Sequence, residues 1–397
     1  MDTFDFNTPV NRRGTDSNKW SRSVLKEVFD NPEAVPMFVA DMDFRCAPCI
    51  TQALVERAQH GIFGYRDGNS HLDAFKNWEQ RRHGWSIDTS WVLQTQGVVP
   101  AIRIAIQRFS QPGDKVLIQQ PVYAPFIRSI LHNGRKPSIN ELILKNGRYE
   151  IDFDDFEKRV RDPDLKIFVL CSPHNPVGRV WSETELRQMA ELCLENRVLM
   201  VVDEIHNDLI MDGQSHHVLA SLDRRFEANA ITCMSPSKTF NIAGLYQSNI
   251  VIPNDWIRQE FWGVIHRLGE GVPNIFGAIA AEAAYTGGDL WVDELCSYLT
   301  RNLAHAKRRF ANELSLVKTY EHQGTYLLWL DFRSLGLSDK ELFRLLSCEA
   351  GVALSRGIEF GQGGSGFMRL NFGCPRAQLD EALDRIIATV KANEEGR

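Results

Sequence analysis

The sequence predicts an α/β fold with a mainly parallel sheet covered by helices on both faces, followed by a smaller α+β unit. Between about residues 90 and 252, short runs rich in Val, Ile and Leu alternate with amphipathic segments. Strands covered on both faces have this near-continuous apolar pattern, and their alternation with helices is typical of a parallel sheet. After about residue 285 the alternation stops, which indicates a second unit.

The strands of the first unit are expected at 91–95, 116–120, 167–171, 198–202, 230–234 and 248–252. The segment 183–196 is expected to be a helix, because Leu186, Met189 and Leu192 share one helical face. In the second unit, strands are expected at 326–332 and 367–372, and helices at 338–350 and 375–394.

The chain has 397 residues, more than one ordinary hydrophobic core accommodates, so two domains are expected. The first 45 residues are rich in loops and are expected to wrap around other parts of the molecule. We therefore divide the chain into an N-terminal segment packing with the small domain (1–45), a large domain (46–285) and a small C-terminal domain (286–397).

Charge and hydropathy narrow the class of partner. The formal net charge of −6 argues against nucleic acid or a membrane surface, because either would require a basic face. The chain contains no apolar run of about 18 residues, and its N-terminus lacks the apolar stretch of a secretory signal. We expect a cytoplasmic protein that binds a small molecule, with no nucleic-acid or membrane partner.

The eight cysteines do not indicate a disulfide framework. Most lie in apolar runs, as Cys171 and Cys233 do, and are expected to be reduced and buried. Cys46 and Cys49 form a CxxC pair, but no second CxxC or HxxxH pair accompanies it to complete a zinc site. We expect this pair to be incidental, at the start of a helix.

Polar and aromatic residues follow five of the expected strands. In an open parallel sheet, ligands bind beyond the carboxyl ends of the strands, so these residues are expected to meet at one edge. They are Gly97 after the first strand, Tyr123 after the second, Asn175 after the third, Asp203 after the fourth, and Ser235 to Lys238 after the fifth.

The types of residue delivered there indicate a particular chemistry. Gly97 comes shortly before a helix expected at 101–109, whose free N–H groups can bind an anion such as phosphate. Asp203 ends an apolar strand, where a carboxylate requires a cationic or N–H partner; a pyridinium nitrogen is one such partner. Lys238, flanked by Ser235 and Ser237, has the setting of an imine-forming amine with phosphate ligands beside it. Simpler readings remain for each: a tight turn, a helix cap and a surface lysine.

The run SPSKTFNIAGL at 235–245 resembles the pyridoxal-phosphate lysine segment of class I/II aminotransferase-like enzymes. Nearly the whole chain is similar, more narrowly, to the MalY/PatB group of cystathionine β-lyases (C–S lyases). The runs that carry this similarity, in the same order, are VADMDF at 39–44, HGIFGY at 60–65, GVVP at 97–100, QPVY at 120–123, SPHNPVG at 172–178, DEIH at 203–206 and GFMRLN at 366–371. The resemblance implies the PLP-dependent transferase-like fold (fold type I) and pyridoxal 5′-phosphate as cofactor.

The resemblance also implies roles around the cofactor ring. Lys238 would form the Schiff base and later move the substrate Cα proton. Asp203 would keep the pyridine nitrogen protonated, and Tyr123 would stack on the ring face. Asn175 would donate to the ring O3′. His206 stands where aminotransferases usually carry a Tyr facing O3′, which departs from their pattern and agrees with the β-lyase group.

Further implied roles concern the phosphate, the substrate and a partner subunit. Arg369, with Asn175 beside it, would bind the substrate α-carboxylate bidentately. Tyr65 would reach the phosphate of the neighbouring subunit's cofactor, which implies a homodimer with sites at the interface. The residues that would hold the phosphate within one chain are Gly97, Val98, Ser235 and Ser237.

The reaction that this resemblance implies is α,β-elimination on a sulfur amino acid, which yields a thiol, pyruvate and ammonia. A plain aminotransferase is the alternative within the fold, and a regulatory binding protein is the alternative of another class. The preferred sulfur amino acid stays open. Among other histidines, His174 lies within the Asn175 motif and could face the site, whereas His216 and His217 are expected in a solvated loop. No metal site is expected.

Overall fold

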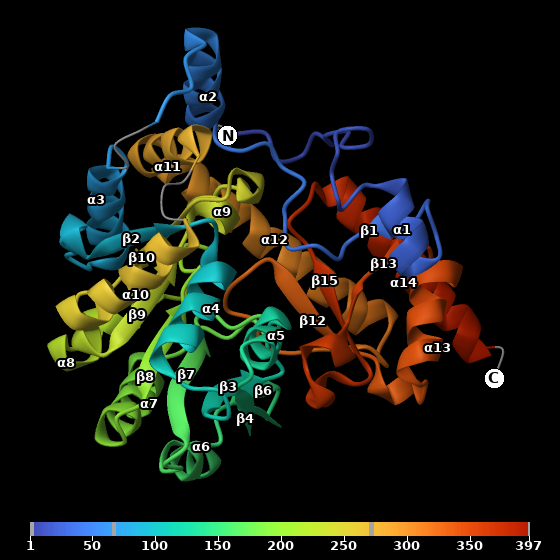
Figure 1. Cartoon of the computed structure of the whole chain (residues 1–397). Helices are drawn as coiled ribbons and strands as arrows, with labels where there is room; N and C mark the ends of the chain where they lie inside the picture. Colours follow the sequence, from blue (N-terminus) through green and yellow to red (C-terminus); the bar gives the residue numbers. More distant parts are fainter. Residues whose placement is uncertain (1–3, 66–68, 270–273, 396–397) are drawn as a thin grey trace.

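The computed structural model describes residues 4–65, 69–269 and 274–395. Its central seven-stranded sheet has the strand order β2-β10-β9-β8-β7-β3-β4 (Figure 1). Only the pairings of β10 with β2 and β9 are antiparallel, so the expected mainly parallel sheet is confirmed. The strands are β2 (Val92–Thr95), β3 (Lys115–Gln120), β4 (Lys136–Glu141), β7 (Leu165–Cys171), β8 (Leu199–Asp203), β9 (Ala230–Met234) and β10 (Ser248–Val251).

Six of these strands begin and end within two residues of their expected bounds, and β4 was not expected. β4 has the sequence KPSINE, in which exposed and buried positions alternate along a strand at the edge of the sheet. An edge strand with one solvated face carries polar residues, so it lacks the apolar run by which the other strands were found.

Helices cover both faces of this sheet because successive strand residues point to opposite sides. On β8, Met200 and Val202 belong to the larger core cluster, which contains Met189 of α7 (Glu183–Glu195). Val201 points the other way, into the cluster built with α4 (Val98–Phe109), α5 (Pro125–His132) and α10 (Asp255–Leu268). The near-continuous apolar sequence of the strand is therefore explained by burial on both faces.

Helix α4 begins at Val98, three residues earlier than expected. Gly97 caps it with φ of 119°, in the left-handed region that glycine tolerates. Pro100 lies in the first turn, where its missing N–H costs no intrahelical bond. The earlier start brings the N-terminus of α4 to the end of β2.

The second sheet is antiparallel, with strand order β11-β12-β15-β14, and lies on the other side of α12 (Asp289–Glu313) in Figure 1. Its strands are β11 (Lys318–Thr319), β12 (Leu327–Asp331), β14 (Ser355–Arg356) and β15 (Phe367–Asn371). The helix expected at 338–350 consists of α13 (Asp339–Arg344) and a π-helical turn over Leu345–Glu349. Helix α14 (Arg376–Glu395) ends the described chain.

The N-terminal segment joins this second part through α1 (Arg22–Phe29) and β1 (Val35–Pro36). β1 pairs in parallel with β13 (Val352–Ala353), and Phe29 packs against Phe343. The division at residues 45 and 285 stays a prediction.

Within the described residues, no helix is long and apolar enough to cross a membrane.

Candidate active site

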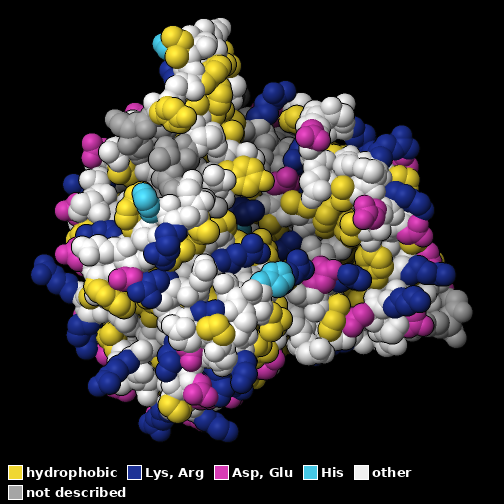
Figure 2. All heavy atoms as spheres, viewed as in Figure 1, with side chains coloured by type: hydrophobic (Ala, Val, Ile, Leu, Met, Phe, Trp, Pro, Cys, Tyr) yellow, Lys and Arg dark blue, Asp and Glu magenta, His cyan; other side chains and the backbone are white. Residues whose placement is uncertain are grey.

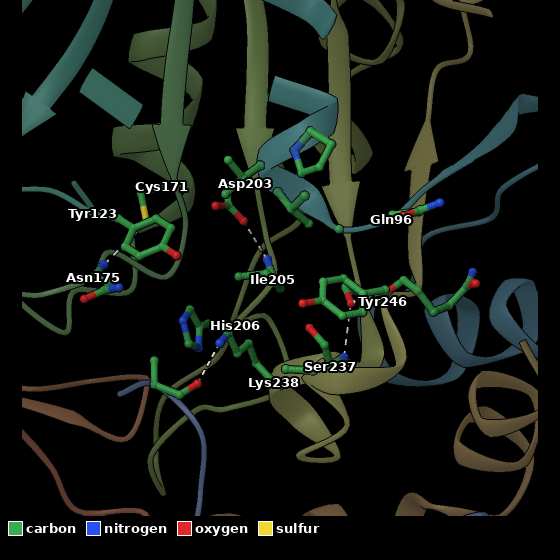
Figure 3. A pocket seen from close by; sticks show the side chains of 18 residues that line it. Gln96, Tyr123, Cys171, Asn175, Asp203, Ile205, His206, Ser237, Lys238 and Tyr246 are labelled. Carbon is green, nitrogen blue, oxygen red and sulfur yellow. Dashed lines mark hydrogen bonds between the residues drawn. The ribbon is translucent and has the colours of Figure 1, made fainter. Parts of the chain in front are cut away.

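A cavity of about 330 Å³ opens at the carboxyl ends of the central strands (Figure 3). The strands that end there are β2, β3, β7, β8 and β9. The last four are parallel neighbours in the sheet, and β2 points the same way because both β2 and β9 run antiparallel to β10. Nine of the eleven residues singled out from the sequence line this cavity: Gly97, Val98, Tyr123, Asn175, Asp203, His206, Ser235, Ser237 and Lys238. The remaining two, Arg369 and Tyr65, are described below.

Lys238 lies in the short helix α9 (Pro236–Thr239), and its amine faces the cavity (Figure 3). Nζ donates a hydrogen bond to the backbone carbonyl of Ala40 at 2.6 Å. Burial lowers the pKa of the amine to about 8, against a partial opposing effect of the Asp41 carboxylate. A substantial fraction of the amine is therefore unprotonated near neutral pH, as a nucleophile requires.

Asp203 is the last residue of β8 and is almost completely buried. Its carboxylate accepts a hydrogen bond from the backbone N–H of Ile205 at 3.2 Å. Burial raises the pKa of Asp203 to about 7, although the Ile205 N–H and the charge of Lys238 oppose the rise. A buried carboxyl in this state is stabilised when a cation reaches it from the cavity.

His206 follows Asp203 by three residues and also points into the cavity (Figure 3). Its side chain is buried, and burial lowers the pKa of the imidazole to about 3. Nδ1 has no hydrogen-bond partner in the described residues. The neutral ring thus offers the cavity a free polar nitrogen, which a bound group can engage.

The N-terminus of α4 and the cap of α9 meet at one end of the cavity. Gly97 and Val98 place the free N–H groups of α4 there. The Ser235 hydroxyl already donates its proton to Gln247 O at 2.6 Å and accepts the Ser237 N–H at 3.1 Å. Ser235 therefore acts first as a helix cap, and Ser237 brings the second hydroxyl to the cavity.

Arg369 comes from β15 in the second sheet and is buried. It donates to Asn175 Oδ1 at 3.1 Å, to the Phe38 carbonyl at 2.7 Å and to Ser355 Oγ at 3.1 Å. Its guanidinium also lies over the ring of Phe360, and burial lowers its pKa to about 10. Arg369 thus contacts Asn175, which lines the cavity, so the second sheet places a cation at the edge of the site.

Tyr65 does not line this cavity. Its side chain is fully exposed, in a segment where Ile62 and Phe63 are also exposed. Tyr65 follows α2 (Pro48–His60), which projects from the body of the molecule (Figure 1). Within one chain, Tyr65 therefore has no access to the site.

Sequence reasoning missed several residues that line the cavity. Ala40 lies in a run that had been noted but received no role, and it reaches Lys238 from almost 200 positions away. The others are Gln96, Val99, Pro100, Cys171, Ile205, Ala243, Tyr246 and Gln247. Several adjoin assigned residues, so the strand-end rule could have included them. Tyr246 and Gln247 carry no such signal, because they precede β10, an antiparallel strand.

The possibility left open for His174 is not met, and the expectation of a solvated His216 was wrong. His174 does not face the cavity: it is buried against Trp181, and Nε2 lies 2.9 Å from Pro121 O. His216 is not solvated, because its side chain is 2% exposed and its Nε2 lies 3.4 Å from Glu204 Oε2. Cys46 and Cys49 are free thiols, and the Cys49 thiol contacts Ala283 O in a neighbouring helix.

Comparisons with known proteins agree with this architecture. The family model for aminotransferase class I and II matches residues 35–386. The chain is 45% identical to cystathionine β-lyase PatB of Bacillus subtilis, over 98% of this chain and 100% of that protein. It is 33% identical to protein MalY of Escherichia coli, over 98% of this chain and 99% of that protein.

Solved structures match as fully. Cystalysin from Treponema denticola, which contains a pyridoxal 5′-phosphate cofactor, matches with a TM-score of 0.95 and 36% identity, over 98% of this chain and 99% of that chain. The PLP-bound C–S lyase from Staphylococcus hominis matches with a TM-score of 0.90 and 31% identity, over 97% and 98%. The chain belongs to the class I and II aminotransferase family and, within it, to the group that contains PatB and MalY.

Proposed function

We propose that this protein is a pyridoxal-phosphate-dependent carbon–sulfur β-lyase that performs α,β-elimination on sulfur amino acids. The observation that carries the proposal is one cavity in which the half-buried amine of Lys238 and the buried carboxyl of Asp203 face the same space with pKa values displaced toward neutrality. Perturbed titratable groups converging in one cavity mark a catalytic site. The similarity to PatB and to PLP-bound C–S lyases supports the choice of reaction.

The residues of the cavity fit this cofactor. Asp203 forms no ion pair with any residue that the structure describes, and it would hold a proton on the pyridine nitrogen. The free Nδ1 of His206 and the amide of Asn175 would serve the ring O3′, and Tyr123 would stack on the ring. The phosphate would take the N–H groups at the start of α4 and the hydroxyl of Ser237. When bound, the cofactor supplies an electron sink for negative charge at the substrate Cα.

Lys238 would hold the cofactor at rest and would then act as the base at the substrate Cα. Its lowered pKa suits both tasks, because only an unprotonated amine could bond to an aldehyde carbon or accept the Cα proton. Arg369 binds and orients the substrate α-carboxylate. Loss of the Cα proton is followed by cleavage of the Cβ–S bond, and the sulfur leaves as a thiol. Hydrolysis of the remaining three-carbon fragment gives pyruvate and ammonia.

Product analysis separates this lyase from a plain aminotransferase of the same family. With cystathionine as the only substrate and no added keto acid, the purified protein should release pyruvate and a free thiol in equal amounts. Lys238→Ala should release neither. Turnover that required a keto acid and yielded no free thiol would identify an aminotransferase instead. A panel of S-substituted cysteines, assayed for pyruvate, would then rank the leaving groups.

We further propose that the protein works as a homodimer in which Tyr65 serves the partner's site. The segment after α2 carries exposed Ile62 and Phe63, and Val55 on α2 is half exposed. Figure 2 shows hydrophobic side chains along the projecting helix, as an interface would require. A phosphate at the start of α4 is held best by donors converging from several directions, and a partner phenol would add one.

Subunit mixing tests this arrangement. Inactive Tyr65→Phe and Lys238→Ala proteins should complement each other, because one site of a mixed dimer takes Lys238 from one chain and Tyr65 from the other. Random exchange gives at most about a quarter of wild-type activity. No recovery after proven subunit exchange would contradict a role across the interface.

The eight free thiols also agree with a reducing compartment, and we place the enzyme in the cytoplasm.

A further inference from the structure

The run at 203–208 has two faces with different surroundings. Asp203 and His206 line the cavity. Glu204 and Asp208 make their contacts elsewhere: Glu204 accepts the backbone N–H of Leu219 at 3.0 Å and lies beside His216. One short stretch of chain thus separates the residues of the active site from a buried polar cluster behind it.

Asp208 is the centre of that cluster. Its Oδ1 accepts hydrogen bonds from Trp78 Nε1 at 3.2 Å and His83 Nε2 at 3.0 Å. Its Oδ2 accepts the hydroxyl of Thr239 at 2.9 Å. Burial by itself would raise the pKa of Asp208, but the hydrogen bond and charge of His83, with the Thr239 hydrogen bond and the charge of Arg82, lower it below its usual value. The carboxylate is therefore ionised, and hydrogen bonds to an ionised acceptor are the stronger kind.

Thr239 is the residue after Lys238 and the last residue of α9. A helix of four residues has no stability of its own, so contacts with the rest of the protein must fix its position. Asp208 holds its end through Thr239. Trp78, which donates to Asp208, also packs against Phe240 at a ring-centroid distance of 5.5 Å. Two of the contacts at this end of α9, the Thr239 hydroxyl and Trp78, therefore converge on Asp208.

We propose that Asp208 is a positioning residue for Lys238: it ties the helix that carries the amine to the loop that carries Asp203 and His206. Asp203 and Lys238 must act at two separate atoms of one rigid ring, so the distance between their elements has to be held closely. The buried hydrogen bond from Thr239 to the ionised carboxylate of Asp208 joins these two elements and sets that distance. The inference rests on the proposed role of Lys238 in binding the cofactor.

The test compares two isosteric substitutions of buried threonines. Thr239→Val removes the hydroxyl that Asp208 accepts. Thr232→Val is the matched control, because Thr232 is buried in β9 and its hydroxyl has no partner in the described residues. Thr239→Ser restores the hydroxyl and should restore the wild-type values. Asp208→Asn, which keeps the volume but removes the charge, is the second variant if Thr239→Val does not fold.

The readouts are the dissociation constant for pyridoxal phosphate and the pH midpoint of the cofactor's visible absorbance band. Thr239→Val should weaken cofactor binding about tenfold, the size expected from losing one hydrogen bond to a buried carboxylate, and should shift the midpoint. Asp208→Asn should act in the same direction, and Thr232→Val should change neither quantity. Both readouts report the setting of the Lys238 amine, which a merely structural contact would leave unchanged.

The proposal is overturned if Thr239→Val lowers the melting temperature while its cofactor affinity and pH midpoint equal those of Thr232→Val. Failure of the proposed function would look different. Borohydride reduction of the wild-type protein with pyridoxal phosphate should label the peptide that contains Lys238, and a label elsewhere would overturn the assignment of Lys238 itself.

Discussion

Two lysines near buried carboxylates differ in their surroundings: among the described residues Lys19 is buried, whereas Lys238 is half-buried at the cavity. Lys19, in the N-terminal segment, places Nζ 2.8 Å from Asp43 Oδ2 and 3.0 Å from the carbonyl of Asp41. Lys238, in the cavity, donates to the neutral carbonyl of Ala40 and makes no ion pair with a described residue. The two lysines therefore differ both in burial and in the groups that contact them.

The carboxylates differ in the same way. Asp43 is bound by Lys19, Arg12 and Trp20, and although burial would raise its pKa, these partners lower it below its usual value. Asp203 accepts one backbone N–H, and burial raises its pKa to about 7. In the first pair every charge is satisfied by the protein. In the second, both groups retain the capacity to bind a ligand, and this separates a structural pair from a functional one.

The largest expected effect is that of Lys238→Ala. Activity should fall by a factor on the order of ten thousand or more, because the nucleophile and the base at Cα are the same amine. Stability should not fall, since the change removes a half-buried amine that makes no ion pair with a described residue. Activity assays and thermal melts of the cofactor-free protein would check both points. A variant that unfolds at a clearly lower temperature would break the comparison with Lys19.

Lys19→Met should show the opposite pattern. Breaking a buried ion pair costs about 3–5 kcal/mol, and we expect the lower end because Arg12 and Trp20 still bind Asp43. Urea unfolding measures this loss. The fraction of folded protein that takes up pyridoxal phosphate should remain that of the wild type. A selective loss of cofactor binding at unchanged stability would show that Lys19 also serves the site.

Arg369→Lys tests a buried cation whose contacts are divided between protein and ligand. Lysine keeps the charge but loses the planar fork, so kcat/KM should fall about a hundredfold, which corresponds to loss of a charged hydrogen bond. The cofactor absorbance spectrum should stay unchanged. Steady-state kinetics with one sulfur amino acid gives the ratio. A value near wild type would mean that another group holds the carboxylate.

The smallest effect concerns a third buried pair, His83 and Asp208. Burial would lower the pKa of His83, but the carboxylates of Glu79 and Asp208, together with that of Glu204, raise it to about 9. Since this exceeds the value in the unfolded chain, its stabilisation is complete below about pH 6.5 and is lost as the pH rises toward 9.

His83→Gln should therefore lower the free energy of unfolding most at pH 6.5, by a value on the order of 2 kcal/mol, and least above pH 9. Urea unfolding of both proteins across this range measures the gap. Glu79 titrates in the same window, because burial raises its pKa to about 8, so Glu79→Gln is the control. His216 and Arg82 also lie near this cluster. A gap that stays constant with pH would mean that His83 is not the titrating group.

Several parts of the fold and site could be predicted from the sequence because their signals are local. Strands buried on both faces leave apolar runs, and the residue after each run lies at a known edge of the sheet. This rule singled out Gly97, Asp203 and Lys238 as candidates, and the family resemblance then decided against the simpler interpretation of each. The specific roles of Arg369 and Tyr65 came from resemblance, and Tyr65 lies outside the cavity of its own chain.

The signals that failed were those that depend on distant contacts. β4 lacks an apolar run because it is an edge strand, and His216 has no local partner to mark its burial. Ala40 reaches Lys238 across 198 positions, and Thr239 reaches Asp208 across 31. Side chains this far apart in the chain meet only when the sheets and helices pack.

The sequence by itself determined which side chains lie at the carboxyl edge of the sheet, because strand periodicity and chain order fix their positions. Only the tertiary structure decided which buried charges are satisfied. Lys19 and Lys238 are both lysines in polar surroundings of the sequence, yet one is neutralised by Asp43 and the other is left beside a carbonyl. The energy of a buried charge depends on the groups within a few ångströms of it, and folding alone brings those groups together.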